Sequence, residues 1–356
     1  MRKIKLAIIF GGKSQEHEIS LKSSQEVTNA LDKEKYDITL VAITKEGRWL
    51  VGEKGQEYLQ LNLPNAEIEG GVAIEQSQAL TSSDGENGLS KLSDGEKSPF
   101  DIVLPIGHGS FLEDGKLQGM LEMLGLPYVF SGTLASALAM NKQKTKLVAK
   151  SVGLKVAKEI VLKKGKKYFE KKIIAKLDFP IVIKPIESGS SVGMSIAKSE
   201  EALIAGIEKA FEYSEEVMLE QFIAGREFTV AVLGNKKPKA LPVIEIIPKT
   251  SEFFDYAAKY QAGGSEEICP ADLPEKISKK IQKDAVKIFQ ALDCKDLARA
   301  DFILSAKDAR PYFLEINTIP GMTSASLVPK AAKAAGLNFS QFLDRLIKEA
   351  ILRNKK

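Results

Sequence analysis

Residues 4–12 read IKLAIIFGG, a short apolar run that ends in two glycines. A continuous run of this length before a glycine turn predicts a buried strand over Ile4–Phe10. The residues that follow predict a helix over about Leu21–Leu31 and a second strand over Tyr36–Ile43. Strand, glycine turn, helix and strand in this order predict a βαβ unit with a parallel sheet and a right-handed crossover.

The α/β pattern continues to about residue 152. We expect strands over Pro99–Ile106 and Leu126–Phe130, a helix over Leu117–Leu124 between them, and one helix over about Ala135–Val152 that leads into a second domain. The segment 76–98 has no aromatic residue and is rich in Gly, Ser, Asp and Glu. This composition predicts an exposed, mobile excursion without a functional role.

Beyond Val156 the predicted strands follow one another without intervening helices in several places, which is typical of an α+β unit with antiparallel hairpins. A long polar loop is predicted over Pro248–Cys269. Strands are predicted over Val156–Val161, Ile181–Lys184, Val217–Glu220, Glu227–Leu233, Ala240–Ile247, Leu297–Leu304 and Pro311–Asn317. Helices are predicted over Phe169–Leu177, Glu201–Phe211, Glu275–Ala291, Leu327–Ala335 and Phe339–Arg353.

The composition is that of a globular protein, with 44% hydrophobic and 28% charged residues in 356. The 51 basic and 47 acidic side chains leave a net charge of +4. This excess is too small and diffuse to indicate nucleic acid as a partner, whereas a pI near 8.7 is compatible with an anionic ligand. Two cysteines without CxxC spacing indicate a reducing compartment, and the apolar run at the N-terminus is too short for a membrane span. We therefore expect a cytoplasmic protein with no membrane partner.

Several motifs of nucleotide and metal chemistry are absent. The P-loop needs a glycine five residues before Gly12, where Ala7 stands, and neither GxGxxG nor HExxH occurs. Only two histidines, His17 and His108, are present. These absences argue against a P-loop NTPase, a dinucleotide-binding enzyme and a histidine-ligated zinc enzyme.

Residues 181–194, IVIKPIESGSSVGM, are the strongest phosphate-binding candidate. A strand delivers Lys184 at its end, and the small residues of 189–193 let backbone N–H groups approach a phosphate. A glycine-rich hairpin with a solvated lysine explains this stretch as well. The weaker stretch 217–227, VMLEQFIAGRE, can present backbone groups and carboxylates to a purine and a ribose, or be an ordinary strand end.

Four polar residues on two predicted strands indicate a metal site. Arg299 and Asp301 lie two apart on one strand, and Glu315 and Asn317 lie two apart on the next. The period of two places each pair on one face, and a hairpin brings the faces together. Carboxylate and amide oxygens suit Mg²⁺ that bridges nucleotide phosphates, and the arginine can stabilise a developing oxyanion. The alternative is a charged ladder that faces water.

Taken together, a series of ordered stretches resembles the ATP-grasp ligases, and more closely the D-alanine–D-alanine ligase family. The resemblance covers the chain except 76–98. The stretches are GGKSQEHEISLKS (11–23), IGHGSFLEDGKLQG (106–119), KP (184–185) followed by GSSVGM (189–194), EQFIAGREFTV (220–230), FFDYAAKY (253–260), ARADF (298–302) and EINTIPGMTSASLVP (315–329).

The resemblance implies an α/β and α+β multidomain fold. It implies an N-terminal Rossmann-like domain over 1–140 and a two-subdomain ATP-grasp fold, with a central subdomain over 141–225 and a C-terminal subdomain over 226–356. The loop 248–269 is implied to be mobile and to close over the site, excluding water from a reactive intermediate.

The resemblance also implies an ATP site between the two ATP-grasp subdomains. Lys142 and Lys184 are implied to hold the phosphates. Glu220 and the backbone through Ile223 are implied to contact the adenine, and Glu227 the ribose. The implied ATP-binding residues are Lys142, Lys184, Ser190, Ser191, Glu220, Gln221, Phe222, Ile223, Glu227, Lys259 and Asn317. The implied ligands of two Mg²⁺ ions, replaceable by Mn²⁺, are Asp301, Glu315 and Asn317.

The activity implied is the ATP-dependent joining of two D-alanines through a D-alanyl phosphate, for peptidoglycan precursors. Glu16 is implied to bind the ammonium of the first D-alanine, His108 to lie near its carboxylate, and Ser326 to hold the carboxylate of the second. Arg299 and the backbone N–H of Gly321 are implied to stabilise the oxyanion. The implied catalytic residues are Glu16, Ser190, Tyr260, Arg299 and Gly321, and the implied substrate-binding residues are Glu16, His108, Lys259 and Ser326.

The sequence departs from the family at Gln221, where lysine is usual, and at Phe111 and Leu112, which are bulkier than usual and predicted to lie near the D-alanine pocket. These two residues keep open an ATP-grasp enzyme that acts on another carboxylate. The sequence is also compatible with a ligase whose second substrate is D-serine or D-lactate, and with a catalytically silent nucleotide-binding regulator. Tyr260 argues against D-lactate, and the intact metal acids argue against the regulator. The resemblance further implies a homodimer.

Overall fold

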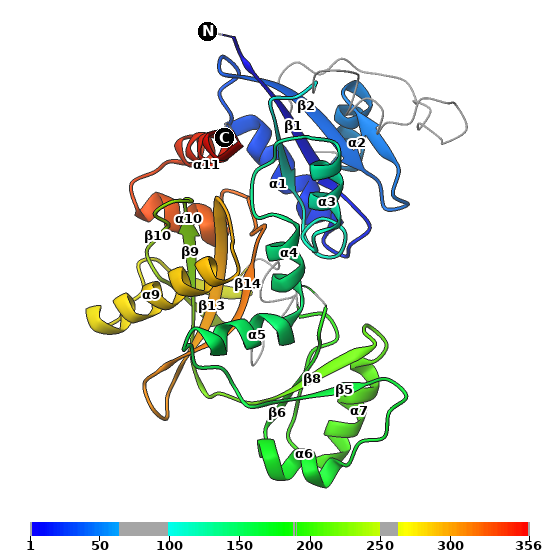
Figure 1. Ribbon diagram of the computed structural model, residues 1–356, viewed down its shortest axis with the longest axis vertical. Coiled ribbons are helices and arrows are strands. Elements are labelled where there is room, and N and C mark those ends of the chain that lie inside the picture. Colours follow the sequence, from blue (N-terminus) through cyan, green and yellow to red (C-terminus); the bar gives the residue numbers. More distant parts are fainter. Residues whose placement is uncertain (1, 64–98, 188, 190, 250–262, 355–356) are drawn as a thin grey trace.

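The computed structural model describes residues 2–63, 99–187, 189, 191–249 and 263–354. Three β-sheets follow one another along the long axis of the molecule (Figure 1). A four-stranded sheet from the N-terminal part lies at one end, a six-stranded sheet in the middle, and a second four-stranded sheet at the other end. The predicted excursion at 76–98 lies outside the described residues.

The first sheet is the predicted parallel unit. Its central strand pairs in parallel with both neighbours, and a short antiparallel strand adds one edge, in the order β3-β2-β1-β4. The strands are β1 (Ile4–Gly11), β2 (Tyr36–Ile43), β3 (Trp49–Val51) and β4 (Ile102–Ile106). The prediction for β2 is confirmed to the residue, because its alternating and β-branched pattern ends where polar residues begin on both sides.

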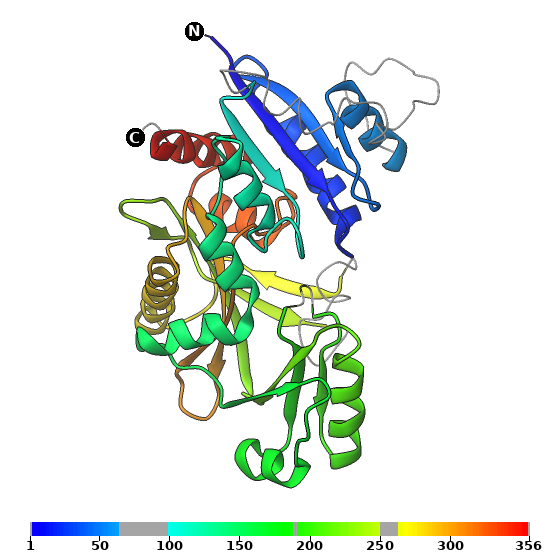
Figure 2. The same ribbon diagram turned by 45° about the vertical axis from the view of Figure 1, so that its right-hand side comes forward.

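Apolar residues of β1 pack on both faces of the first sheet, as its continuous apolar run predicts. Ile8 and Phe10 belong to a core shared with the C-terminal helix α11 (Phe339–Asn354), whereas Ala7 and Ile9 pack with residues of α3 (Lys116–Met123). Helix α11 therefore returns the chain to the first sheet, where both ends of the described chain lie (Figure 2). The remaining helices of this part are α1 (His17–Ala30) and α2 (Glu53–Asn62).

The long helix predicted over 135–152 is two helices, α4 (Thr133–Met140) and α5 (Lys142–Ser151). Asn141 separates them in an extended conformation, with φ −86° and ψ 99°, and its side chain accepts a hydrogen bond from the N–H of Lys144 at 3.0 Å. An asparagine favours this helix-capping geometry over a helix interior. The break sets the direction of α5, which packs against β14 and α9.

The six-stranded sheet is antiparallel, in the order β12-β11-β9-β13-β14, with β10 paired to β9. Helix α9 (Glu275–Ala291) packs on one face, and the sequence predicts its bounds and those of β14 to the residue. The strands are β9 (Gly225–Leu233), β10 (Lys239–Ala240), β11 (Ile244–Pro248), β12 (Ser265–Ile268), β13 (Leu297–Ser305) and β14 (Pro311–Asn317), and helix α10 (Leu327–Ala334) follows them.

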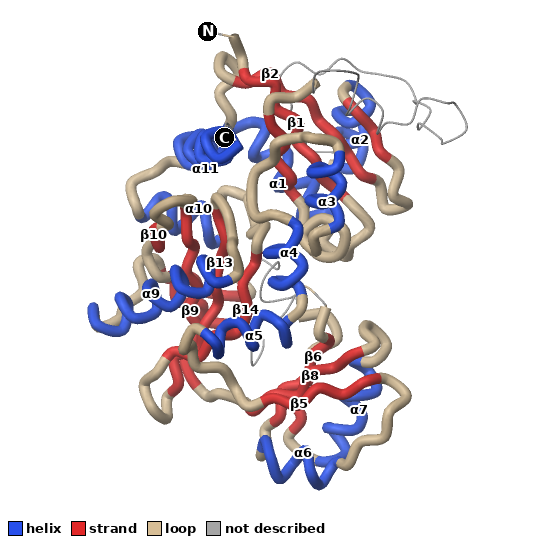
Figure 3. Tube along the Cα trace, in the orientation of Figure 1, coloured by secondary structure: helices blue, strands red, loops and turns tan. Residues whose placement is uncertain are grey.

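The second four-stranded sheet is also antiparallel, in the order β5-β8-β6-β7. Its strands are β5 (Glu159–Lys163), β6 (Ile181–Pro185), β7 (Ser195–Ala197) and β8 (Glu216–Gln221), with α6 (Glu170–Leu177) and α7 (Glu200–Ala210). Both helices lie on one face of this sheet (Figure 3). They pack there through Ile181, Ile183, Leu203 and Ile207 among others. The other face of this sheet lines a pocket.

Three further predictions of secondary structure are wrong. The single strand predicted over Ala240–Ile247 is two strands, β10 and β11. The strand predicted over 126–130 is only an isolated parallel bridge between Val103 and Tyr128, because this segment meets β4 for too short a distance to extend the sheet. Part of the polar loop predicted over 248–269 is strand β12, which pairs with β11; the rest, 250–262, lies outside the described residues. In the part of the chain that the structure describes, no helix is long and apolar enough to cross a membrane.

Candidate active site

Two adjoining pockets lie between the sheets. The larger pocket, of about 270 Å³, is lined from α1, the loop after β4, the ends of β13 and β14, and the start of α10. The smaller pocket, of about 130 Å³, lies between the six-stranded sheet and the second four-stranded sheet. Lys142 and Glu315 line both pockets, so that chemistry at this wall can act on groups bound in either.

The hairpin of β13 and β14 brings together the four polar residues that the sequence singles out. Arg299 lies opposite Asn317, and Asp301 lies opposite Glu315. The guanidinium of Arg299 donates two hydrogen bonds to Asp301, at 3.0 and 2.8 Å, and the amide of Asn317 donates a third at 3.3 Å. The predicted hairpin is confirmed, and these side chains line the pockets instead of forming a ladder in open solvent.

A β-bulge in this hairpin is not readable from the sequence. The register shifts between Asp301 and Phe302, so that Leu314 is the extra residue on β14. A bulge interrupts the alternation of side chains along a strand. As a result Leu314 and Glu315, although adjacent, both line the smaller pocket, while Ile316 packs in the core.

The smaller pocket has an apolar part and a cationic part. On β6 the alternation sends Ile181 and Ile183 to the helix-covered core, and Val182 and Lys184 to the pocket. Burial lowers the pKa of Lys184 to about 8, and an anionic ligand near it would raise that pKa again. Apolar walls with lysines at one end suit a flat base joined to phosphates. The implied ATP-binding residues that line this pocket are Lys142, Lys184, Ser191, Glu220, Gln221, Phe222, Ile223 and Glu227.

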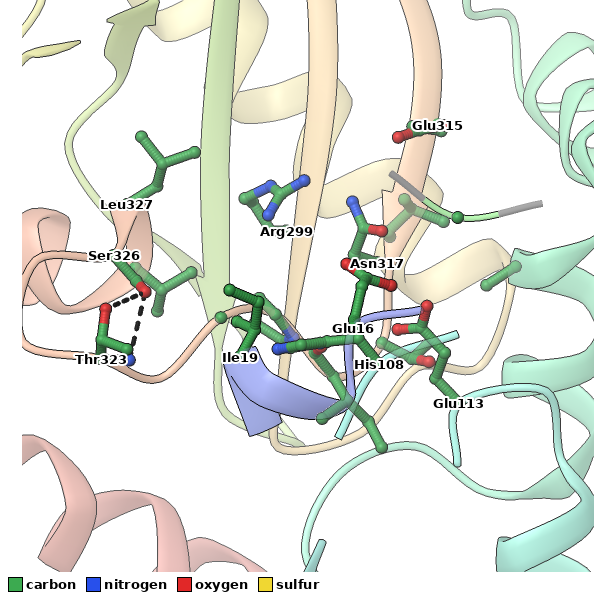
Figure 4. A pocket seen from close by; sticks show the side chains of 18 of the residues that line it. Glu16, Ile19, His108, Glu113, Arg299, Glu315, Asn317, Thr323, Ser326 and Leu327 are labelled. Atoms are coloured by element: carbon green, nitrogen blue, oxygen red, sulfur yellow. Dashed lines mark hydrogen bonds between the residues drawn. The ribbon is translucent and has the colours of Figure 1, made fainter. Parts of the chain in front are cut away.

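The larger pocket has an acidic and imidazole end (Figure 4). Glu16, before the first turn of α1, and His108, after β4, are both buried. The Nδ1 of His108 donates to the carbonyl of Ile319 at 2.9 Å, which assigns the ring hydrogen to that nitrogen. Burial lowers the pKa of His108, and a carboxylate bound beside the ring would raise it again.

The opposite end of the larger pocket is formed by the turn before α10 (Figure 4). The hydroxyl of Ser326 accepts from the backbone N–H of Thr323 at 3.1 Å and shares a hydrogen bond of 2.7 Å with the Thr323 hydroxyl. Gly321 lies against this group, since a Cβ there would come within 3.0 Å of the Ser326 oxygen. The structure therefore brings Glu16, His108, Arg299, Gly321 and Ser326 to one pocket, as the resemblance implies.

Three implied residues, Ser190, Lys259 and Tyr260, lie outside the described residues. Asn317, implied to bind both ATP and metal, lines the larger pocket.

Phe111 and Leu112 are bulkier than usual in the family and were expected to lie near the D-alanine pocket. Neither side chain lines the larger pocket. Leu112 is fully buried in the core under β1, where a Cβ on Gly107 would come within 2.1 Å of it, and Phe111 is 38% exposed. The bulk of these residues fills the core and the surface, and leaves the pocket unchanged.

Several residues of the site were not assigned a role from the sequence. Glu113 lines the larger pocket, accepts from the N–H of Gly109 at 2.9 Å, and has its pKa raised to about 8 by burial and by the nearby Glu16. Lys146 is fully buried behind the smaller pocket. Glu113 is an acid inside the stretch 106–119, which is the one signal that could have marked it; nothing local marks Lys146. Lys22 and Glu267 also line the larger pocket.

The donor set fits magnesium better than zinc. Among the described residues, no three His, Cys, Asp or Glu side chains cluster in a way that could hold a metal ion, as a zinc site would require. Asp301, Glu315 and Asn317 instead offer two carboxylates and one amide oxygen, which is the incomplete oxygen set that Mg²⁺ accepts when phosphates and water complete its shell.

Comparison with known proteins identifies the family. The sequence model described as "D-ala D-ala ligase N-terminus" matches residues 5–131, and that described as "D-ala D-ala ligase C-terminus" matches residues 148–348. The chain belongs to the D-alanine–D-alanine ligase family. It is thus a member of a family of ATP-dependent ligases, and its three-sheet architecture is the ATP-grasp fold of that family with its N-terminal domain.

Individual members of the D-alanine–D-alanine ligase family match over their full length. A D-alanine–D-alanine ligase of Natranaerobius thermophilus is 39% identical over 100% of this chain and 97% of its own. The VanG D-Ala:D-Ser ligase from Enterococcus faecalis has a TM-score of 0.81 and 35% identity, over 98% of this chain and 100% of its own. The D-alanine–D-alanine ligase from Bacillus anthracis, solved in complex with ATP, has a TM-score of 0.73 and 29% identity, over 99% of both chains.

Proposed function

We propose that this protein joins two D-alanines to D-alanyl-D-alanine, with ATP converted to ADP and phosphate, and thereby supplies the dipeptide for peptidoglycan precursors. The observation that carries this proposal is the wall shared by the two pockets. A nucleotide in the smaller pocket directs its terminal phosphate towards Lys142 and Glu315, and the larger pocket opens on the same two residues. The larger pocket is thus suited to a small zwitterion that attacks the phosphate.

The residues of the larger pocket divide the two substrates between them. Glu16 binds the ammonium of the first D-alanine, and His108 lies near its carboxylate. At the other end, Ser326 binds the carboxylate of the second D-alanine, and Lys259 and Tyr260 complete the site. Two binding ends in one cavity of about 270 Å³ favour two small amino acids over one large substrate.

The proposed reaction has two steps. An oxygen of the first D-alanine carboxylate attacks the γ-phosphorus and ADP leaves, which gives D-alanyl phosphate. The amine of the second D-alanine then attacks the carbonyl carbon, loses a proton and displaces inorganic phosphate. Arg299 and the backbone N–H of Gly321 donate to the oxyanion of the second step, where each such donor is worth about 10²–10³ in rate.

In the smaller pocket, Lys142 and Lys184 hold the phosphates with the turn at 189–193, including Ser190 and Ser191. The segment from Glu220 to Ile223 holds the adenine, Glu227 the ribose, and Asn317 completes the site. Two Mg²⁺ ions, replaceable by Mn²⁺, are held by Asp301, Glu315 and Asn317, and when bound they neutralise charge on the triphosphate.

The proposal includes assembly and location. We place the protein in the cytoplasm, as a homodimer, with the domain limits 1–140, 141–225 and 226–356. Support for the location comes from the cysteine usage and from ATP as a substrate.

An isotope experiment tests the proposed reaction. With D-alanine labelled by ¹⁸O in its carboxylate, one labelled oxygen should appear in the released phosphate for each dipeptide formed, because the carboxylate oxygen bonds to phosphorus in the first step. Unlabelled phosphate would exclude the acyl phosphate. If no ATP is turned over even when D-alanine is present, the catalytically silent regulator is favoured instead.

D-Serine as the second substrate is the alternative that a specific observation favours. The VanG D-Ala:D-Ser ligase matches this chain at a TM-score of 0.81 with 35% identity, slightly higher identity than the D-alanine–D-alanine ligase from Coxiella burnetii, at 31%. Competition between D-alanine, D-serine and D-lactate for the second position, with products identified by mass, decides between them. We expect D-alanyl-D-alanine as the main product.

A further inference from the structure

Helix α5 carries a stripe of three lysines at every fourth position, Lys142, Lys146 and Lys150. Residues four apart lie on one face of a helix. Each lysine pairs with a carboxylate on a different strand: Glu315 on β14 at 3.9 Å, Glu220 on β8, and Glu159 on β5 at 2.8 Å, respectively.

The lysine stripe crosses from one wall of the smaller pocket to the other. Helix α5 packs against β14 of the six-stranded sheet, whereas β8 and β5 belong to the second four-stranded sheet. The two carboxylates on that sheet, Glu220 and Glu159, face each other as cross-strand partners. Like charges in this position repel, so Lys146 and Lys150 stabilise the pairing of β5 with β8 near the pocket.

The middle pair of the stripe is the buried one. The Lys146 side chain is 0% exposed and that of Glu220 is 3% exposed, whereas the Lys150 side chain is 44% exposed. One carboxylate oxygen of Glu220 contacts Lys146 and the other contacts Lys184. Lys184 and Glu220 line the smaller pocket, but Lys146 does not.

A nucleotide in the smaller pocket changes this arrangement, if the proposed function holds. Lys184 is then drawn to the phosphates, and the Glu220 oxygen that it contacted becomes available to the base. A buried carboxylate that loses one of its two contacts depends on the remaining one to keep its position. Lys146, which cannot reach the pocket, stays beside the other oxygen.

We propose that Lys146 is a positioning residue that holds the Glu220 carboxylate in its orientation when the nucleotide binds, so that Glu220 accepts a hydrogen bond from the amino group of adenine. This inference rests on the proposed function, in which Glu220 contacts the base. Lys146 is thereby a determinant of selectivity for adenine nucleotides over those with a carbonyl oxygen at the same position.

Calorimetric titration of the full-length protein with Mg-ADP and with the magnesium complex of inosine diphosphate (IDP) tests the inference. In IDP a carbonyl oxygen replaces the amino group of adenine. We expect Lys146→Met to weaken ADP binding about tenfold and IDP binding less than about threefold, since a hydrogen bond to a charged group is lost only for ADP. Equal weakening for the two nucleotides, or none, would overturn the inference, because a merely structural role does not distinguish the bases.

Lys150→Met is the matched control, one turn further along the same stripe. Its partner Glu159 does not line the pocket, so we expect both affinities to stay within about twofold of the wild type. If Lys146→Met does not fold, Glu220→Gln is compared with the double variant Lys146→Met/Glu220→Gln. Equal ADP affinity supports the inference, and a double variant more than about threefold weaker overturns it.

The same titration separates this inference from the proposed function. If the wild-type protein prefers ADP to IDP but forms no dipeptide, the proposed ligase activity is contradicted. The role of Lys146 is then still decided by the ADP and IDP affinities of Lys146→Met. A wild-type protein with no preference for ADP over IDP overturns the role of Lys146 directly.

Discussion

Arg299 is held in a fixed orientation by two hydrogen bonds to Asp301, and it lines the larger pocket. Its proposed role is to stabilise the oxyanion of the coupling step. We expect Arg299→Ala to lower kcat by about 10²–10³, because the oxyanion loses a charged donor. Arg299→Lys should retain part of the activity, since it keeps the charge without the planar fork. Steady-state kinetics measure this, and near-normal turnover of the folded alanine variant would remove Arg299 from the mechanism.

Glu315 lies at the wall shared by the two pockets, 3.9 Å from Lys142. We expect Glu315→Gln to raise the Mg²⁺ concentration for half-maximal activity at least about tenfold, because a neutral amide is a weaker ligand of a hard cation. Activity is measured over a Mg²⁺ titration, with Glu266→Gln as the control, an acid on β12 whose side chain is 51% exposed. Full activity of Glu315→Gln at low Mg²⁺ would contradict the ligand role.

The sequence predicts the site residues that lie on strands better than those buried behind the pockets. The period of two in β13 and β14 is enough to group Arg299 with Asp301 and Glu315 with Asn317, and their hairpin is confirmed. Lys146 has no such signal, because its partner Glu220 comes from a strand of another sheet. Burial of a charge depends on distant segments, which a local pattern does not contain.

At the scale of elements, Asn141 decides how α4 and α5 are joined. Its side chain caps α5 and also donates to Glu187 at 2.9 Å. We expect Asn141→Ala to lower the free energy of unfolding by about 1 kcal/mol, because the N–H of Lys144 loses its acceptor. Asn141→Ser should restore most of it, since serine is an equally good cap. Urea unfolding measures both, and an alanine variant as stable as the wild type would show that the cap contributes nothing.

The helix break and the β-bulge show why element boundaries were only partly predicted. The residues around Asn141 continue a helical pattern, so one helix over 135–152 fits the sequence although the structure has two. The bulge at Asp301 and Phe302 arises from pairing between strands and sends Leu314 to the smaller pocket. By contrast, α9 and β14 agree to the residue because clear stop signals flank them.

At the scale of the whole molecule, Arg353 connects the C-terminal helix to the first sheet and the middle sheet. It donates to the carbonyls of Tyr128 and Phe130 and pairs with the fully buried Asp296 at 3.0 Å. The same carboxylate accepts from the N–H of Phe130 at 2.9 Å. The three parts of the chain are thus fixed to one another at this point.

Burial raises the pKa of Asp296 to about 6, whereas Arg353 lowers it. The folded state therefore holds a proton on Asp296 more tightly than the unfolded chain, and the stability from this group is greatest at low pH and is lost as the pH rises from about 4 to about 6. In Arg353→Ala the pKa of Asp296 rises further.

We accordingly expect Arg353→Ala to cost about 3 kcal/mol of unfolding free energy at pH 8, where the buried carboxylate is charged and has lost its cation, and less at pH 5, where it is protonated. Unfolding by urea at the two pH values measures this. Arg345→Ala, an exposed position on the same helix, is the control, with a change within about 0.5 kcal/mol. An equal loss at both pH values would contradict the assignment to Asp296.

The most direct test of the proposed function is the release of phosphate from ATP with Mg²⁺, with and without D-alanine, while the products are identified by mass spectrometry. We predict that phosphate release depends on D-alanine and that one D-alanyl-D-alanine appears for each phosphate. Phosphate release that is independent of D-alanine, or no dipeptide in its presence, would contradict the account.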